Sequence, residues 1–143
     1  MKEKLINHLN GSDILDDADI EFLLNKYKEW RYSGTAYRVL IFFKAYEYND
    51  FVLKSVQFDK SFSKTEQGIS YFISTKDLNG DAFSSFEPKI ILIKCNCYGI
   101  DVEKVRKDIP NLPQYTCYEE EIIPLEVSDL EIVYNGDAKD FYL

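Results

Sequence analysis

The chain has 143 residues, of which 45% are hydrophobic and 15% are aromatic, and its formal net charge at pH 7 is −8. This apolar content is too high for a disordered chain, and the length is typical of a single domain with one core. The negative charge repels phosphate backbones, so it disfavours nucleic acid as a partner while leaving room for a small basic pocket.

The composition also argues against membrane and metal-binding classes. The N-terminal sequence "MKEKLINHLNGSDILDD" lacks the apolar core of a signal peptide, and no window holds the roughly 18 apolar residues of a membrane helix. We therefore expect a soluble, cytoplasmic protein with no membrane partner. Cys95, Cys97, Cys117 and His8 do not have the spacing of zinc ligands, so we expect no metal and reduced thiols packed in strands.

The chain begins with two predicted helices. Residues 2–10 and 12–30 both place apolar side chains at the 3.6-residue spacing of a helix. Asn10-Gly11 ends the first helix, and Ser33-Gly34 ends the second, which carries acids early and lysines late. Residues 1–34 are therefore predicted to be a helical N-terminal part.

The remainder, residues 35–143, is predicted to be rich in β-strands. Alternating or β-branched apolar segments predict strands at residues 35–43, 51–59, 88–99, 116–126 and 130–136. Short helices interrupt them, one capped by Ser63 with Gly68 as a weak point, the other capped by Asp101. Helices followed by strands, without a regular βαβ alternation, indicate an α+β fold with a mostly antiparallel sheet in one domain.

Three groups of polar residues stand out against these strands. Arg38 lies in the middle of an apolar strand, and Ser61 and Ser63 precede a helix. Glu119 and Glu121 are two residues apart, so strand alternation would place them on one face, with Cα atoms about 6.6–6.8 Å apart.

Each group also has an ordinary structural interpretation. Arg38 could pair with a surface acid, and the two serines could simply end a strand and cap a helix. The glutamates from 119 to 121 could keep an apolar strand soluble.

The joint pattern resembles a known family. Tyr37-Arg38, "SFSKTEQGISYF" and "EEEIIPLE" follow the order seen in ADP-ribosyltransferases of the arginine–serine–glutamate type, especially small phage and toxin-like members. The resemblance spans roughly residues 37–133. It implies a two-sheet ADP-ribosyltransferase core, NAD⁺ as substrate, no metal, and transfer of ADP-ribose to an arginine of a host protein in the host cytoplasm.

The resemblance also implies catalytic roles for two glutamates. Cleavage of the nicotinamide–ribose bond develops positive charge on the ribose, which a fixed carboxylate stabilises. Glu121 takes this role and bonds the ribose 2′-hydroxyl in the family pattern. Glu119 would position or deprotonate the incoming nucleophile.

The binding roles follow from the same resemblance. Arg38, with Tyr37 beside it, would hold the dinucleotide, because a guanidinium matches phosphate oxygens. Ser61 would orient Glu121 with Ser63 nearby. Tyr115 or Tyr118, in the segment before the glutamates, would contact the target protein.

Two alternative functions remain open from the sequence. The chain could keep this fold and act as a non-catalytic acidic binding or inhibitor protein. It could also be an NAD⁺ glycohydrolase that transfers ADP-ribose only to water. The oligomeric state is not indicated by the sequence.

Overall fold

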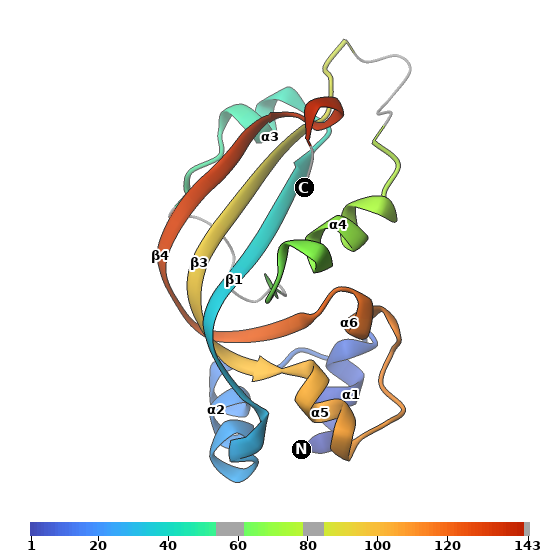
Figure 1. Ribbon diagram of the computed structural model, residues 1–143, viewed down its shortest axis with the longest axis vertical. Helices are drawn as coiled ribbons and strands as arrows, with labels where there is room; N and C mark the ends of the chain where they lie inside the picture. The colour runs from blue at the N-terminus through green and yellow to red at the C-terminus, as the bar shows by residue number, and fades with distance from the viewer. Residues whose placement is uncertain (54–61, 79–84, 142–143) are drawn as a thin grey trace.

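The computed structural model describes residues 1–53, 62–78 and 85–141 (Figure 1). The elements, in chain order, are α1 (Lys2–Leu9), α2 (Asp17–Lys26), η1 (Lys28–Trp30), β1 (Arg31–Phe42), α3 (Ala45–Asn49), β2 (Phe62–Ser63), α4 (Glu66–Ser74), β3 (Lys89–Asp101), α5 (Val102–Asp108), α6 (Tyr115–Tyr118), β4 (Glu121–Asp137) and η3 (Ala138–Asp140). The fold is thus of the α+β class.

The sheet is built around β3, which pairs with β1 on one side and β4 on the other. The two-residue strand β2 joins β1 through Tyr37–Ser63 and β4 through Ser63–Glu121, so the order β1-β2-β4-β3 closes into a barrel. Every pairing is antiparallel, which confirms that part of the prediction. The expectation of two sheets is wrong for the described strands, because all four strands belong to one curved, closed sheet (Figure 1).

Strand β4 merges two predicted strands. Residues 116–126 and 130–136 were expected to form separate strands, but β4 is continuous from Glu121 to Asp137. Asp129 has a φ of +54°, and the register with β3 shifts between Lys94 and Asn96. The Asn96 amide donates to the Asp129 carboxylate at 2.8 Å. The polar break in the sequence is therefore a β-bulge inside one strand.

The N-terminal part follows the prediction with different bounds. Helix α1 ends next to Asn10, and Gly11 has a φ of +82°, as a helix terminator requires. Helix α2 begins at a capping box between Asp16 and Asp19 and ends at Lys26. The sheet then starts at Arg31 instead of residue 35. Ser33 and Gly34, which were predicted to break the helix, pair with residues near the C-terminal end of β3.

The described buried side chains form three groups, one of them much larger than the others. The largest one packs α1 and α2 against α5 and the adjoining ends of β3 and β4, and consists of Leu5, Leu9, Leu15, Ile20, Leu23, Leu24, Trp30, Ile100, Val102, Val105, Leu112 and Ile123. Trp30 stacks on Tyr27 at 4.1 Å between ring centroids, and its indole N–H donates to Asp108 at 2.6 Å. The second group consists of Ala36, Phe62, Cys95, Cys97 and Ile122. The third consists of Ile91 and Ile93, which pack against partly buried side chains that include Leu40, Phe42 and Tyr48.

Other predictions have mixed outcomes. Cys95 and Cys97 are buried free thiols in β3, as expected, whereas Cys117 is exposed in helix α6 and not in a strand. The predicted strand at residues 51–59 falls mostly on residues 54–61, outside the described residues. No helix in the described ranges combines the length and the apolar character needed to cross a membrane.

Candidate functional site

A cavity of about 290 Å³ opens where β1 and β2 separate beyond their single residue pair. Its lining residues come from α4 on one side and from α6 and the start of β4 on another. Figure 1 shows where these elements lie. The cavity lining consists of Arg38, Val39, Phe62, Ser63, Gly68, Ile69, Phe72, Tyr115, Glu119 and Glu121. The cavity therefore brings together residues from the first, middle and last thirds of the chain.

The two predicted catalytic glutamates both line this cavity, but strand alternation does not put them there. Residues 115–118 form helix α6, so the strand predicted at residues 116–126 begins only at Glu121. Glu119 is the C-cap of α6, and Glu120 has a φ of +50°. This left-handed residue turns the chain between helix and strand. Glu120 is not part of the described cavity lining, and its carboxylate accepts a hydrogen bond from the Thr65 hydroxyl.

Ser63 is the serine that the structure places beside Glu121. The two residues are direct partners across β2 and β4, and only 5% of Ser63 and 3% of Glu121 is exposed. The Ser63 hydroxyl donates to the Glu119 carbonyl at 2.6 Å. The helix cap predicted for Ser63 is wrong, because Thr65 caps α4 by accepting from the Gly68 amide. Ser61 lies outside the described residues.

Arg38 reaches the cavity from β1. Its guanidinium carbon lies 5.8 Å from the ring centroid of Phe62, which also lines the cavity. This contact is of the cation–π type and holds the cation at the wall. Tyr37 is not part of the described lining, and its recorded role in the sheet is to pair with Ser63 of β2.

The two predicted recognition tyrosines differ in their contacts. Tyr115 lines the cavity with its ring, while its hydroxyl donates to the Leu9 carbonyl of α1 at 2.5 Å. Burial, followed by the charges of Glu121 and Glu119, raises the pKa of Tyr115 to about 12. Tyr118 is exposed and packs on Tyr71 of α4, with ring centroids 5.0 Å apart. It thus links α4 to α6 and does not belong to the described cavity lining.

Replacing Tyr115 with phenylalanine is expected to lower the free energy of unfolding by about 0.5–1.5 kcal/mol, the net value of one hydrogen bond. The ring keeps its place in the cavity wall, but α6 loses its tie to α1. Urea unfolding checks the loss. Tyr118→Phe is the matched control, because Tyr118 makes its interhelical contact through the ring, and a loss equal in both variants contradicts the prediction.

Glu119 is a cavity carboxylate whose acidity is perturbed. Burial raises the pKa of Glu119 above its ordinary value of 4.5, and the charge of Lys76 opposes this only in part. The folded state therefore binds the proton more tightly than the unfolded state does. Between pH 4.5 and the raised pKa, the free energy of unfolding falls as the pH rises.

Glu119→Gln is consequently expected to be more stable than the wild type at pH 7, because it removes a carboxylate that is costly to bury. The difference should shrink as the pH falls toward 4.5, where the wild-type side chain becomes neutral as well. Thermal unfolding across this pH range measures it. Glu131→Gln, at an exposed position, reports how much of the effect comes from net charge alone. Equal pH profiles for the two variants contradict the prediction.

Sequence reasoning missed three contributors to this site, namely Phe62, Thr65 and Gly68. Phe62 is buried and contacts Arg38, and Thr65 caps α4. A Cβ on Gly68 would lie 2.1 Å from the Ser63 hydroxyl and 2.2 Å from the Glu119 carbonyl oxygen. The signal for Gly68 was that an isolated glycine costs a helix about 1 kcal/mol relative to alanine, so a packing reason for it was worth seeking.

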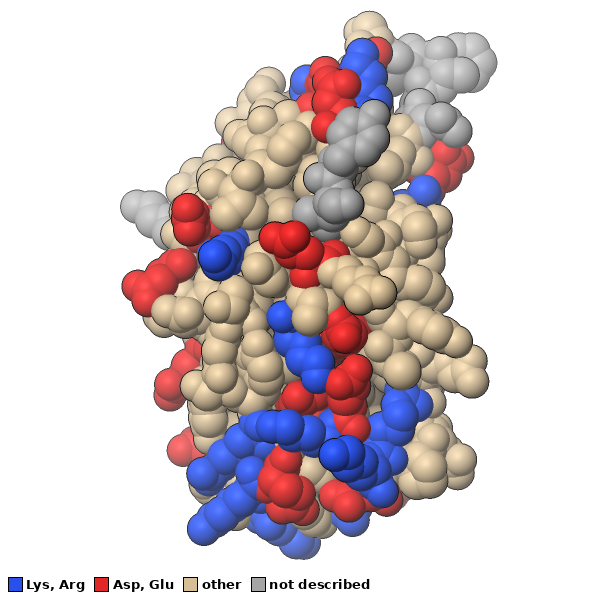
Figure 2. Space-filling model, in the orientation of Figure 1, with Lys and Arg blue, Asp and Glu red and all other residues tan. Residues whose placement is uncertain are grey.

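The charges on the face drawn in Figure 2 are mixed. Figure 2 shows acidic side chains interspersed with lysine and arginine on this face, with basic side chains gathered at the end formed by the N-terminal helices and α5. Among the described residues, no group of three or more His, Cys, Asp or Glu side chains is placed to hold a metal ion. The cavity itself combines one guanidinium with two carboxylates.

Comparison of the chain with protein-family models, with curated proteins and with solved structures finds no match.

Proposed function

We propose that this protein is a mono-ADP-ribosyltransferase that moves ADP-ribose from NAD⁺ to an arginine side chain of a host protein. The observation that supports this proposal is the convergence of Arg38, Ser63, Glu119 and Glu121 on one cavity. Arg38, Ser63 and Glu121 lie on three different strands and Glu119 follows α6, and strand pairing alone gives no reason for a guanidinium and two carboxylates to share one cavity. The two carboxylates suit the positive charge of the nicotinamide part of NAD⁺, and the guanidinium suits its phosphates.

The reaction breaks the bond between nicotinamide and ribose, and the electron pair leaves with the nicotinamide. The ribose C1′ becomes electron-deficient, and Glu121 stabilises this charge from a fixed, buried position. A guanidine nitrogen of the target then bonds to C1′, and Glu119 accepts its proton. Burial favours the protonated form of Glu119, which raises its pKa and makes the side chain a better proton acceptor than an exposed carboxylate.

The size of the cavity indicates which part of NAD⁺ it receives. Small-ligand pockets measure roughly 300–1,000 Å³, and this one, at about 290 Å³, is at the lower end. It suits the nicotinamide and its ribose, with the remainder of the dinucleotide outside. Phe62, Ile69 and Phe72 offer apolar walls to the nicotinamide ring, and Arg38 offers a guanidinium to the phosphates.

The proposal is tested by incubating the protein with bacterial lysate and NAD⁺ labelled in its adenylate part. Labelled protein and free nicotinamide are the expected products for the wild type. Arg38→Met is expected to lose both. Arg31→Met is the matched control, because Arg31 lies on the same strand and its guanidinium donates to Leu24 and Asn25, neither of which lines the cavity.

The other outcomes separate the rival functions. Release of nicotinamide with free ADP-ribose and no labelled protein indicates a glycohydrolase. Absence of both products from the wild type overturns the proposed activity. The acidic binding alternative gains no support from the face in Figure 2, where basic side chains interrupt the acidic ones.

A further inference from the structure

Three consecutive residues before helix α4, Ser63 to Thr65, donate hydrogen bonds to the turn between α6 and β4. The Ser63 hydroxyl donates to the Glu119 carbonyl at 2.6 Å, and the Lys64 amide donates to the Glu120 carbonyl at 3.0 Å. The Thr65 hydroxyl donates to the Glu120 carboxylate. Two segments more than 50 residues apart in sequence are therefore joined by three hydrogen bonds.

Thr65 uses its hydroxyl in two directions. The oxygen accepts from the Gly68 amide at 3.1 Å, which caps α4, and the proton goes to Glu120. A threonine that only capped the helix would need no acceptor beyond it. The hydroxyl therefore couples the first turn of α4, which covers the cavity, to the residue between the two cavity glutamates.

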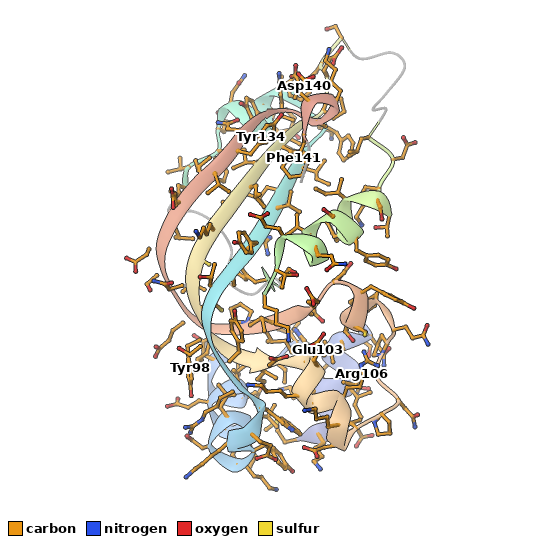
Figure 3. The ribbon with its side chains drawn as sticks, viewed as in Figure 1. Tyr98, Glu103, Arg106, Tyr134, Asp140 and Phe141 are labelled. Atoms are coloured by element: carbon orange, nitrogen blue, oxygen red, sulfur yellow. The ribbon has the colours of Figure 1, made fainter. Side chains whose placement is uncertain are left out.

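Glu120 carries a backbone conformation that a glutamate rarely adopts. Its φ is +50°, and such residues persist only where surrounding contacts impose the conformation. The contacts here come from Lys64 and Thr65. The ammonium of Lys64 is itself held by Asp101 at 3.4 Å and by Glu103 at 2.5 Å, at the start of α5, where Figure 3 shows Glu103.

We propose that Thr65 and Glu120 form a clasp that positions Glu119 and Glu121 in the cavity, with Glu120 acting as a positioning residue. The left-handed turn directs Glu119 and Glu121 into one cavity, and the clasp holds that turn against the cap of α4. The catalytic consequence of the clasp rests on the proposed function. Its geometric part does not depend on any reaction.

Three variants isolate the clasp from the helix cap. Thr65→Ser keeps both the capping acceptor and the donor. Thr65→Asp keeps a good N-cap but can no longer donate to Glu120. Glu120→Gly accepts the positive φ without strain and removes the carboxylate. Hydrogen exchange at the Lys64 amide reports the turn, because this amide bonds to the Glu120 carbonyl.

We expect exchange at the Lys64 amide to be faster in Thr65→Asp and Glu120→Gly and unchanged in Thr65→Ser. Thr65→Asp also sets a second carboxylate beside Glu120, whereas Glu120→Gly removes the carboxylate, so faster exchange in both variants reports the lost hydrogen bond and not repulsion alone. Nicotinamide release should show kcat lowered roughly 10- to 100-fold in the first two variants with KM little changed, since a small misplacement of catalytic groups affects the rate most strongly. Wild-type exchange in Thr65→Asp and Glu120→Gly overturns the clasp. Unchanged kcat despite faster exchange overturns the positioning role. If the wild type releases no nicotinamide, the proposed function fails, while the exchange result still decides the clasp.

Discussion

Glu121→Gln is expected to lower the rate of ADP-ribose transfer from NAD⁺ about 10²- to 10³-fold, the usual cost of removing one preorganised electrostatic group. The amide keeps the shape of the side chain, so the protein should fold and bind NAD⁺. It cannot carry the negative charge that opposes the developing positive charge on the ribose. The effect should therefore appear in kcat, with little change in KM.

The position of Glu121 explains why this expectation is large. Only 3% of the residue is exposed, and it is fixed at the start of β4 by its pairing with Ser63. A carboxylate held out of water interacts more strongly with a nearby charge than one at the surface does. It also needs no reorganisation when the ribose becomes positive.

The measurement compares nicotinamide release and protein labelling in purified wild type, Glu121→Gln and Glu126→Gln. Glu126 lies on the same strand and is exposed, so its variant controls for the loss of one negative charge. Equal rates in wild type and Glu121→Gln would remove Glu121 from the mechanism. Equal losses in both variants would point to a general charge effect in place of a catalytic role.

The sequence predicted the members of the cavity better than the backbone that assembles them. Arg38, Ser63, Glu119 and Glu121 were singled out by residue type and by the elements expected to carry them, and all four line one cavity. Strand alternation correctly grouped Glu119 with Glu121, but for the wrong reason, because Glu119 does not lie in a strand. The actual cause is the positive φ of Glu120, which depends on contacts with residues 64 and 65 and so has no local signature.

The exchange of roles between Ser63 and Thr65 has a similar origin. Both residues stand just before α4, and a serine three positions before Glu66 fits a capping box. Pairing of Ser63 with Glu121 draws the serine into the sheet and leaves the cap to Thr65. The closure of the barrel by two residues of β2 is equally non-local, because so short a strand carries no alternation to recognise.

Gly68→Ala is expected to lower the free energy of unfolding by about 1–3 kcal/mol, the usual cost of overpacking a well-packed site. Alanine is intrinsically the better helix former by about 1 kcal/mol, so helix propensity alone predicts the opposite sign. The added Cβ would lie 2.1 Å from the Ser63 hydroxyl and 2.2 Å from the Glu119 carbonyl oxygen. The second contact is with backbone, which cannot rotate away as a side chain can.

The same substitution should also disturb the cavity, because the added Cβ would overlap both partners of the hydrogen bond between the Ser63 hydroxyl and the Glu119 carbonyl. Urea unfolding measures the stability, and nicotinamide release at a temperature where the variant is folded measures the site. Gln67→Ala is the matched control, since Gln67 is the exposed neighbour in the same helical turn and its replacement gains a smaller amount of helix propensity without a clash. If Gly68→Ala proves as stable as Gln67→Ala, then helix α4 does not pack directly on the glutamate turn, and the close contact between them is not what holds Glu119 in the cavity.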